Sequence, residues 1–132
     1  MPTDQHTILI VEDEPLIRLV LIEALQDEGY LTLAASSVLE AIGLLGKFPR
    51  IDGLVTDVDL PGGLSGLDLL ELFNQCRPTA AQIVVSGRSD LKAGDLPPRA
   101  RFFSKPYSLD GVIAELDCQI AAANAVLHRH AR

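Results

Sequence analysis

Cysteine is scarce in this sequence, and the scarcity excludes several kinds of site. Only two cysteines occur in 132 residues, Cys76 and Cys118, and they lie far apart in the chain. Zinc sites and thiol redox motifs need closely spaced cysteines, so we expect neither. So few cysteines are also typical of a reducing compartment, and we predict a cytoplasmic protein.

Basic residues are also in short supply. The chain has 11 Lys and Arg against 18 Asp and Glu, which gives a formal net charge of -7. Nucleic-acid backbones and anionic membrane surfaces attract proteins with a basic face. The composition therefore argues against direct binding to nucleic acid or to a membrane.

Long uncharged apolar runs are missing as well. Arg18 and Glu23 interrupt the first predicted helix, and the stretch 1–4 lacks the basic start of a signal peptide. We therefore predict neither a membrane span nor a signal peptide. The 48% of hydrophobic residues is nevertheless enough for a core. We predict one domain over residues 1–132, with its core over about residues 6–127.

Short apolar runs rich in β-branched residues predict five strands. The clearest are residues 8–11, 53–56 and 83–86, and weaker candidates are residues 31–34 and 101–104. Runs of this kind, apolar on both faces, are typical of strands buried in a parallel sheet.

Helical patterns fill the gaps between these strands. Pro15 suits the first turn of a helix over residues 15–28, which Gly29 ends. Capping boxes, Ser37 with Glu40 and Ser65 with Asp68, open a second and a third helix. A last helix begins near Ser108, with an apolar stripe at Leu109, Ile113, Leu116, Ile120, Ala123 and Leu127.

The segment between the last two predicted strands is poor in helical signals. Gly87 and Gly94 enclose only six residues, and Pro97-Pro98 follows soon after. We predict a fourth helix that is short or disordered. The alternation of strands and helices otherwise predicts a doubly wound α/β domain with a five-stranded parallel sheet.

Ligands of such sheets bind beyond the carboxyl ends of the strands, so the residues that follow each strand are the candidates for a site. These residues are Glu12 and Asp13 after the first strand, Asp57 after the third, Ser86 at the end of the fourth and Lys105 after the fifth. Clustered carboxylates repel one another, which predicts a bound cation.

In their order and spacing, these motifs resemble the receiver domain of two-component response regulators. The matching stretches are "ILIVEDEP", "LVTDVDLPGG", "IVVSG" and "FFSKPY". The resemblance implies a flavodoxin-like strand order of 2-1-3-4-5, which sets Asp13 beside Asp57. It also implies that Cys76 and Cys118 lie on opposite faces of the sheet.

The resemblance further implies a magnesium-dependent phosphoacceptor. Asp13 and Asp57 would bind Mg2+ directly, Glu12 through water, and Asp59 through its backbone carbonyl. Asp57 would accept a phosphoryl group from a histidine kinase or a phosphotransfer protein. The protein would catalyse only its own phosphorylation and dephosphorylation, signal to a downstream protein target, and stand alone as a single-domain regulator.

The remaining roles concern activation. Lys105 would stabilise charge on the phosphoryl group, and its peptide bond to Pro106 would be cis. Ser86 and Phe102 would be the switch pair. Plain core packing explains Phe102 equally well, and this alternative stays open.

Several features depart from the commonest receivers or add to them. The loop "DVDLPGGLSG" is one residue longer than usual, and we predict that Asp59 pairs with Arg88 across the site. Pro15, Leu19 and Ile22 predict an apolar docking stripe on the first helix.

Two alternative functions stay open at this stage. Asp57-Val58-Asp59 also matches magnesium-dependent phosphohydrolases of the haloacid dehalogenase type, although their motif normally follows the first strand. The other alternative is a receiver-like scaffold that binds partners without being phosphorylated.

Overall fold

The computed structural model describes residues 5–88, 91 and 93–130 of the chain. Its centre is a parallel sheet of five strands in the order β2-β1-β3-β4-β5. This order confirms the predicted topology. The strands are β1 (Thr7–Val11), β2 (Leu31–Ala35), β3 (Gly53–Asp57), β4 (Ala81–Ser86) and β5 (Arg101–Ser104).

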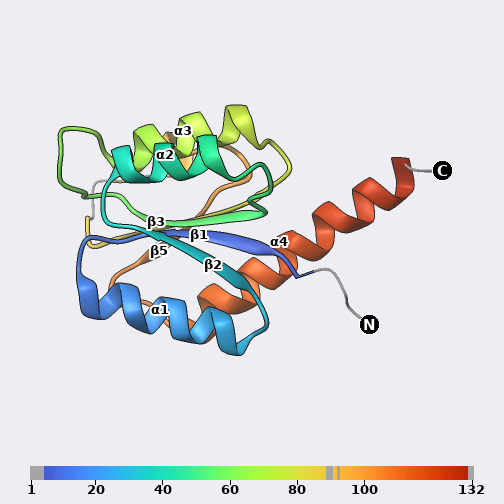
Figure 1. Cartoon of the computed structure of the whole chain (residues 1–132), viewed down its shortest axis with the longest axis horizontal. Coiled ribbons are helices and arrows are strands. Elements are labelled where there is room, and N and C mark those ends of the chain that lie inside the picture. The colour runs from blue at the N-terminus through green and yellow to red at the C-terminus, as the bar shows by residue number, and fades with distance from the viewer. Residues whose placement is uncertain (1–4, 89–90, 92, 131–132) are drawn as a thin grey trace.

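Helices cover both faces of this sheet, as Figure 1 shows. The four α-helices of the described residues are α1 (Pro15–Asp27), α2 (Val38–Lys47), α3 (Gly66–Cys76) and α4 (Leu109–His130). Alternate strand residues face the two layers: Leu9 and Leu54 belong to the core with α2 and α3, whereas Ile8 and Val55 belong to the core with α1 and α4. The sheet is thus apolar on both faces, as the short hydrophobic runs predict.

The helix ends follow the predicted signals. Pro15 opens α1, and Gly29 follows its end with a φ of 100°, a conformation that suits glycine. Ser65 and Asp68 form a complete capping box at the start of α3. At α2, Ser37 caps Glu40 as predicted, but the Glu40 carboxylate accepts hydrogen bonds from Ser36 instead of from the cap residue.

Strand β4 begins two residues earlier than predicted. The polar residue Gln82, which interrupts the apolar run, is fully buried inside the strand. The side-chain amide of Gln119 on α4 accepts a hydrogen bond from the Gln82 backbone N–H at 2.8 Å and donates to its carbonyl at 3.3 Å. The Gln82 side chain donates to Asn74 at 3.0 Å. A buried glutamine is tolerated here because most of its polar atoms have partners.

The segment between β4 and β5 holds a single 3-10 helix, η1 (Ala93–Asp95), among its described residues. Residues 89, 90 and 92, which belong to the predicted fourth helix, lie outside the described residues. Phe102, in β5, packs against the core on the α2 and α3 side.

Helix α4 extends past the end of the sheet at which β1 begins (Figure 1). Val112, Leu116 and Ile120 bury its inner face. Of the predicted stripe, Leu109 and Ile113 pack at the border of the same core. No helix that the structure describes combines the length and apolar character needed to cross a membrane.

The two cysteines are exposed and unpaired. Cys76 ends α3 and Cys118 lies on α4, so they belong to opposite faces of the sheet, as predicted.

Candidate functional site

The carboxyl ends of β1 and β3 bring three acidic residues together. These strands are neighbours in the sheet, but α1 and α3 leave them toward opposite faces, which is where doubly wound sheets bind ligands. One carboxylate oxygen each of Glu12, Asp13 and Asp57 lies within 4.8 Å of the others. The structure therefore confirms that the acidic residues predicted from the strand ends meet at one place.

Glu12 is almost completely buried, which is unusual for a carboxylate. Its Oε2 accepts a hydrogen bond from the Glu14 backbone N–H at 3.0 Å, whereas its buried Oε1 has no hydrogen-bond partner. Burial raises the pKa of Glu12, and the charge of Asp57 raises it further, although the hydrogen bond from Glu14 opposes both. An unpartnered buried oxygen beside two more carboxylates is suited to a cation.

Asp57 is 5% exposed at the end of β3, and both of its carboxylate oxygens have partners. Oδ1 accepts from the Asp59 backbone N–H at 3.2 Å, and Oδ2 accepts a short hydrogen bond from the Lys105 ammonium group. Burial lowers the pKa of Lys105, but the hydrogen bond and charge of Asp57 outweigh burial and raise it. The lysine therefore stays protonated, and it points at the carboxylate across the end of β4.

The Lys105-Pro106 peptide bond is cis, as predicted. Lys105 follows directly after β5, so the edge strand of the sheet positions the positively charged side chain of the site.

Ser86 lies at the buried end of β4, beside the strand that carries Asp57. Its hydroxyl oxygen accepts a hydrogen bond from the Arg88 backbone N–H at 3.0 Å. Phe102 pairs with Val84 in the register between β4 and β5, two residues before Ser86. Both members of the predicted switch pair are thus on neighbouring strands near the site.

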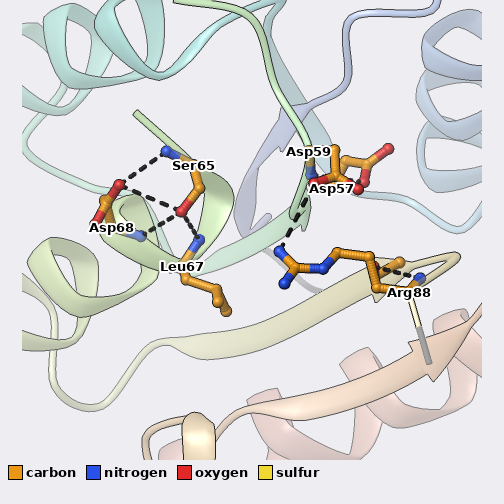
Figure 2. Close-up of polar contacts among 7 residues, drawn as sticks. Asp57, Asp59, Ser65, Leu67, Asp68 and Arg88 are labelled. Atoms are coloured by element: carbon orange, nitrogen blue, oxygen red, sulfur yellow. Dashed lines mark hydrogen bonds and ion pairs between the residues drawn. The ribbon is translucent and has the colours of Figure 1, made fainter. Parts of the chain in front are cut away.

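Asp59 and Arg88 approach each other from the two loops that flank Asp57 (Figure 2). The Arg88 Nη1 atom lies 3.9 Å from Asp59 Oδ1, and both side chains are well exposed. The structure confirms the predicted pairing across the site. An exposed ion pair of this kind contributes little to folding stability. Any role it has in the site therefore comes from its position beside Asp57.

The start of α3 is packed tightly against the loop that follows Asp57. The Gly66 N–H donates to the Val58 carbonyl at 2.7 Å, and a Cβ atom at position 66 would lie 1.9 Å from the Asp57 carbonyl oxygen. The Ser65 and Asp68 capping box holds the helix start in place (Figure 2). Next to this contact, the longer loop forms an open hollow of about 460 Å³ lined by residues 58–61, residues 63–65 and Asp13.

The donor set fits a hard divalent cation such as Mg2+. Three carboxylates converge, one oxygen is buried without a partner, and oxygen ligands are what this ion prefers. Residues 57–59 also place the Asp59 backbone directly beside Asp57, and the role of its carbonyl stays a prediction.

Two residues near the site escaped the sequence analysis. Arg18 reaches back from α1 to the loop after β1, and Tyr107 follows Lys105 by two residues. Burial raises the pKa of Tyr107, and so does the negative charge of Glu12. The position of Tyr107 directly after Lys105-Pro106 was the one signal that pointed to it.

Comparison with known proteins agrees with this geometry. The model of the response regulator receiver domain family matches residues 8–116. The curated sensor kinase CckA from Brucella abortus (strain 2308) is 36% identical over 107 residues, which are 78% of this chain and 11% of that kinase. The chain spans 11% and 24% of the length of the first two curated relatives that it matches.

Solved structures show the same fold. A response regulator receiver protein from Sinorhizobium medicae WSM419 gives a TM-score of 0.85 at 27% identity, over 91% of this chain and 98% of the other. TrrA from Thermotoga maritima, a response regulator protein solved in complex with Mg(2+)-BeF, gives 0.73 at 27% identity, over 87% and 99%.

Proposed function

The chain belongs to the response regulator receiver domain family, the phosphoacceptor domains of two-component systems, and from this premise we propose that Asp57 is its phosphoacceptor. One observation carries the proposal: the nearly buried Asp57 carboxylate lies between Lys105 and the acidic pair Glu12 and Asp13. Receiver domains are signalling domains, not classical enzymes. The chemistry that we assign to this chain is limited to its own phosphorylation and dephosphorylation.

In the proposed reaction, one Asp57 carboxylate oxygen attacks the phosphorus of a phosphohistidine. The new O–P bond forms as the N–P bond breaks, and the donor histidine takes up a proton as it leaves. Lys105 then faces the added phosphoryl group, because its ammonium group already lies against Asp57. Its raised pKa keeps the positive charge available at neutral pH.

Glu12, Asp13, Asp57 and the Asp59 carbonyl would hold Mg2+. The bound ion supplies positive charge that offsets the negative charge of the phosphoryl oxygens in the transition state. The presence of Mg(2+)-BeF in the related TrrA structure supports this assignment. The unpartnered Oε1 of Glu12 supports it independently.

Ser86 and Phe102 would transmit the change. The Ser86 hydroxyl now accepts a hydrogen bond from the Arg88 N–H, and in the phosphorylated form it would donate to a phosphoryl oxygen. That movement would draw in the loop after β4 and leave space for Phe102 to repack. The donor would be a histidine kinase or phosphotransfer protein, and the signal would pass to a downstream protein.

The two alternatives find no support here. Asp57-Val58-Asp59 follows the third strand, whereas haloacid dehalogenase-type phosphohydrolases carry the motif after the first. The scaffold hypothesis requires no phosphoacceptor residues, but two further acids and the lysine lie around the Asp57 carboxylate, and Ser86 ends the neighbouring strand.

The test is phosphorylation by acetyl phosphate with Mg2+, followed by intact-mass spectrometry. We expect one added phosphoryl group on the wild-type protein and none on Asp57→Asn. Asp59→Asn, which changes the neighbouring exposed carboxylate, should still be labelled. Equal labelling of wild type and Asp57→Asn would refute the assignment, and no labelling of the wild-type protein would favour the scaffold.

A further inference from the structure

Arg18 connects the end of the first turn of α1 to the acidic loop. Its Nη1 atom donates a hydrogen bond of 2.8 Å to the backbone carbonyl of Glu12, six residues earlier in the chain. The side chain is half-buried, and its charge also reaches Glu40 at the start of α2, where it helps to lower the pKa of that carboxyl after the larger effect of the Ser36 hydrogen bonds. Arg18 therefore lies between α1, α2 and the loop after β1.

The Glu12 residue is held at three of its atoms. Its N–H donates to the Ala35 carbonyl at 3.0 Å, its carbonyl accepts from Arg18, and its Oε2 accepts from the Glu14 N–H. Of these three partners only Arg18 acts through a side chain, so it is the one partner whose substitution removes a contact while Glu12 itself stays unchanged. The atom left over is Oε1, the buried oxygen that has no partner.

We propose that Arg18 is a positioning residue of the cation site: by holding the Glu12 carbonyl it fixes the turn that presents Glu12 Oε1 and the Asp13 carboxylate toward Asp57. This inference rests on the magnesium site proposed above. The three carboxylates repel one another, so a loop without this anchor would relax away from the compact arrangement within 4.8 Å. Outer contacts of this kind commonly set the affinity of a metal site.

Charge and geometry predict opposite outcomes for the loss of Arg18. A guanidinium group near three carboxylates repels an incoming cation, so removing its charge alone would tighten Mg2+ binding. Removing the anchor of the loop would weaken it. The sign of the change therefore separates a positioning residue from a residue that acts only through its charge.

The experiment is isothermal titration of the whole chain with Mg2+. Arg18→Met keeps much of the apolar stem but removes both charge and donor, and we expect its dissociation constant to rise about tenfold. Lys47→Met is the matched control, because it removes one positive charge from the last turn of α2, whose first turn follows the carboxyl end of β2 and therefore lies nearer the acidic loop. Its affinity should stay within about twofold of wild type, since exposed distant charges are screened.

A second readout is amide hydrogen exchange of Glu14 in the absence of Mg2+. The Glu14 N–H donates to Glu12 Oε2, so it should exchange faster in Arg18→Met than in wild type or Lys47→Met. Arg18→Gln provides the same test should the methionine variant fail to fold. Unchanged or tighter Mg2+ binding in a folded Arg18 variant would overturn the inference.

Asp13→Asn distinguishes the failure of this inference from the failure of the proposed site. If Asp13→Asn binds Mg2+ as well as wild type, the proposed site is wrong, and the inference falls with it. If Asp13→Asn binds weakly while Arg18→Met binds normally, the site stands and only the role of Arg18 is refuted.

Discussion

Asp57 accepts hydrogen bonds from two different sides, one from Lys105 and one from its own loop. The pair formed by Asp59 and Arg88 lies just outside this arrangement. Both side chains are exposed, and their ion pair connects the loop after β3 to the loop after β4 beside Asp57 (Figure 2). If Asp57 is the phosphoacceptor, as proposed, we expect this ion pair to limit the access of water to the acyl phosphate.

Arg88→Ala should therefore shorten the lifetime of the phosphorylated protein without preventing labelling. An exposed ion pair contributes about 0.2–1 kcal/mol, so we expect autodephosphorylation to become faster by up to about fivefold. The decay of radiolabelled phosphoprotein measures the rate. Asp59→Asn removes the other half of the pair, and adding it to Arg88→Ala should change little. A rate equal to that of wild type would reduce Arg88 to an ordinary surface residue.

Most residues of the site could be predicted from sequence because they follow strands that were themselves recognisable. Glu12, Asp13, Asp57, Ser86 and Lys105 all meet this condition. Arg18 could not be predicted in this way, since it lies within a helix and contacts a backbone carbonyl, which any residue possesses. Sequence patterns show which side chains a helix carries, but not where a long flexible side chain ends.

At the scale of single elements, α1 presents an apolar surface that differs from the predicted stripe. Leu16, Leu19 and Val20 are 75%, 48% and 52% exposed. Ile22, by contrast, is partly buried against the core that α1 shares with α4, and the docking role of the predicted stripe stays a prediction. The buried face of α1 is set by Leu21 and Leu25, which places Ile22 at its border.

This exposed surface is suited to the apolar face of a helical phosphodonor. Leu19→Glu should slow phosphotransfer from a cognate phosphotransfer protein at least about tenfold, because it buries a charge in the complex. Labelling by acetyl phosphate should be unchanged. Leu39→Glu is the control, since it changes another exposed leucine, on α2, that is 67% exposed. Loss of both reactions in Leu19→Glu would indicate damage to the fold instead.

The end of α1 meets α4 through an acidic contact. The Tyr30 hydroxyl donates to Asp117, and the hydrogen bond between Glu28 and Asp117 raises the pKa of Glu28, as does the charge of Asp117. A raised carboxyl pKa means that the folded state holds the proton more tightly than the unfolded state. This contribution is fully present below the unfolded pKa and is lost as pH rises through the folded one.

Glu28→Gln should therefore stabilise the protein near neutral pH. Glutamine keeps a donor for Asp117 but carries no charge at any pH, so the repulsion between the two carboxylates disappears. We expect Tm at pH 7 to rise by about 1–2 °C, as for a weak surface charge interaction. Thermal unfolding between pH 4 and pH 8 measures the difference, which should shrink toward pH 4. A difference independent of pH would assign the effect to something other than titration of Glu28.

For the molecule as a whole, the topology was predictable because every strand is bounded by a recognisable end and the motifs fall in a fixed order. Strand lengths were less predictable. Gln82 breaks an apolar run, and only its tertiary partners Gln119 and Asn74 explain why it is buried in β4. The segment before β5 lacks helical signals in its sequence, which predicted a short or disordered helix. Among its described residues, the helical structure is the short 3-10 helix η1.

This segment links Ser86 to Phe102, so it lies on the route from the site to the far edge of the sheet. Its described backbone hydrogen bonds include the one from the Ala100 N–H to the Pro97 carbonyl at 3.0 Å. We expect amides 93–100 to exchange rapidly in the unmodified protein and at least about tenfold more slowly with Mg2+ and beryllofluoride. Amides of α3 should be protected in both states. Strong protection of residues 93–100 before beryllofluoride is added would refute this prediction.

The contact between Gly66 and the backbone of Asp57 also limits which residues the chain tolerates at position 66. A Cβ atom at position 66 would lie 1.9 Å from the Asp57 carbonyl oxygen, whereas at Gly43 and Gly46 it would meet no atom within 4 Å. Alanine can therefore replace either glycine of α2, and each replacement would stabilise the helix by about 1 kcal/mol. Position 66 is closed to every residue but glycine for as long as the loop after β3 keeps its path. Because the close atoms belong to the backbone of residues 57 and 58, the demand for glycine at 66 comes from the path of this loop, and it would persist whatever side chain stood at position 57.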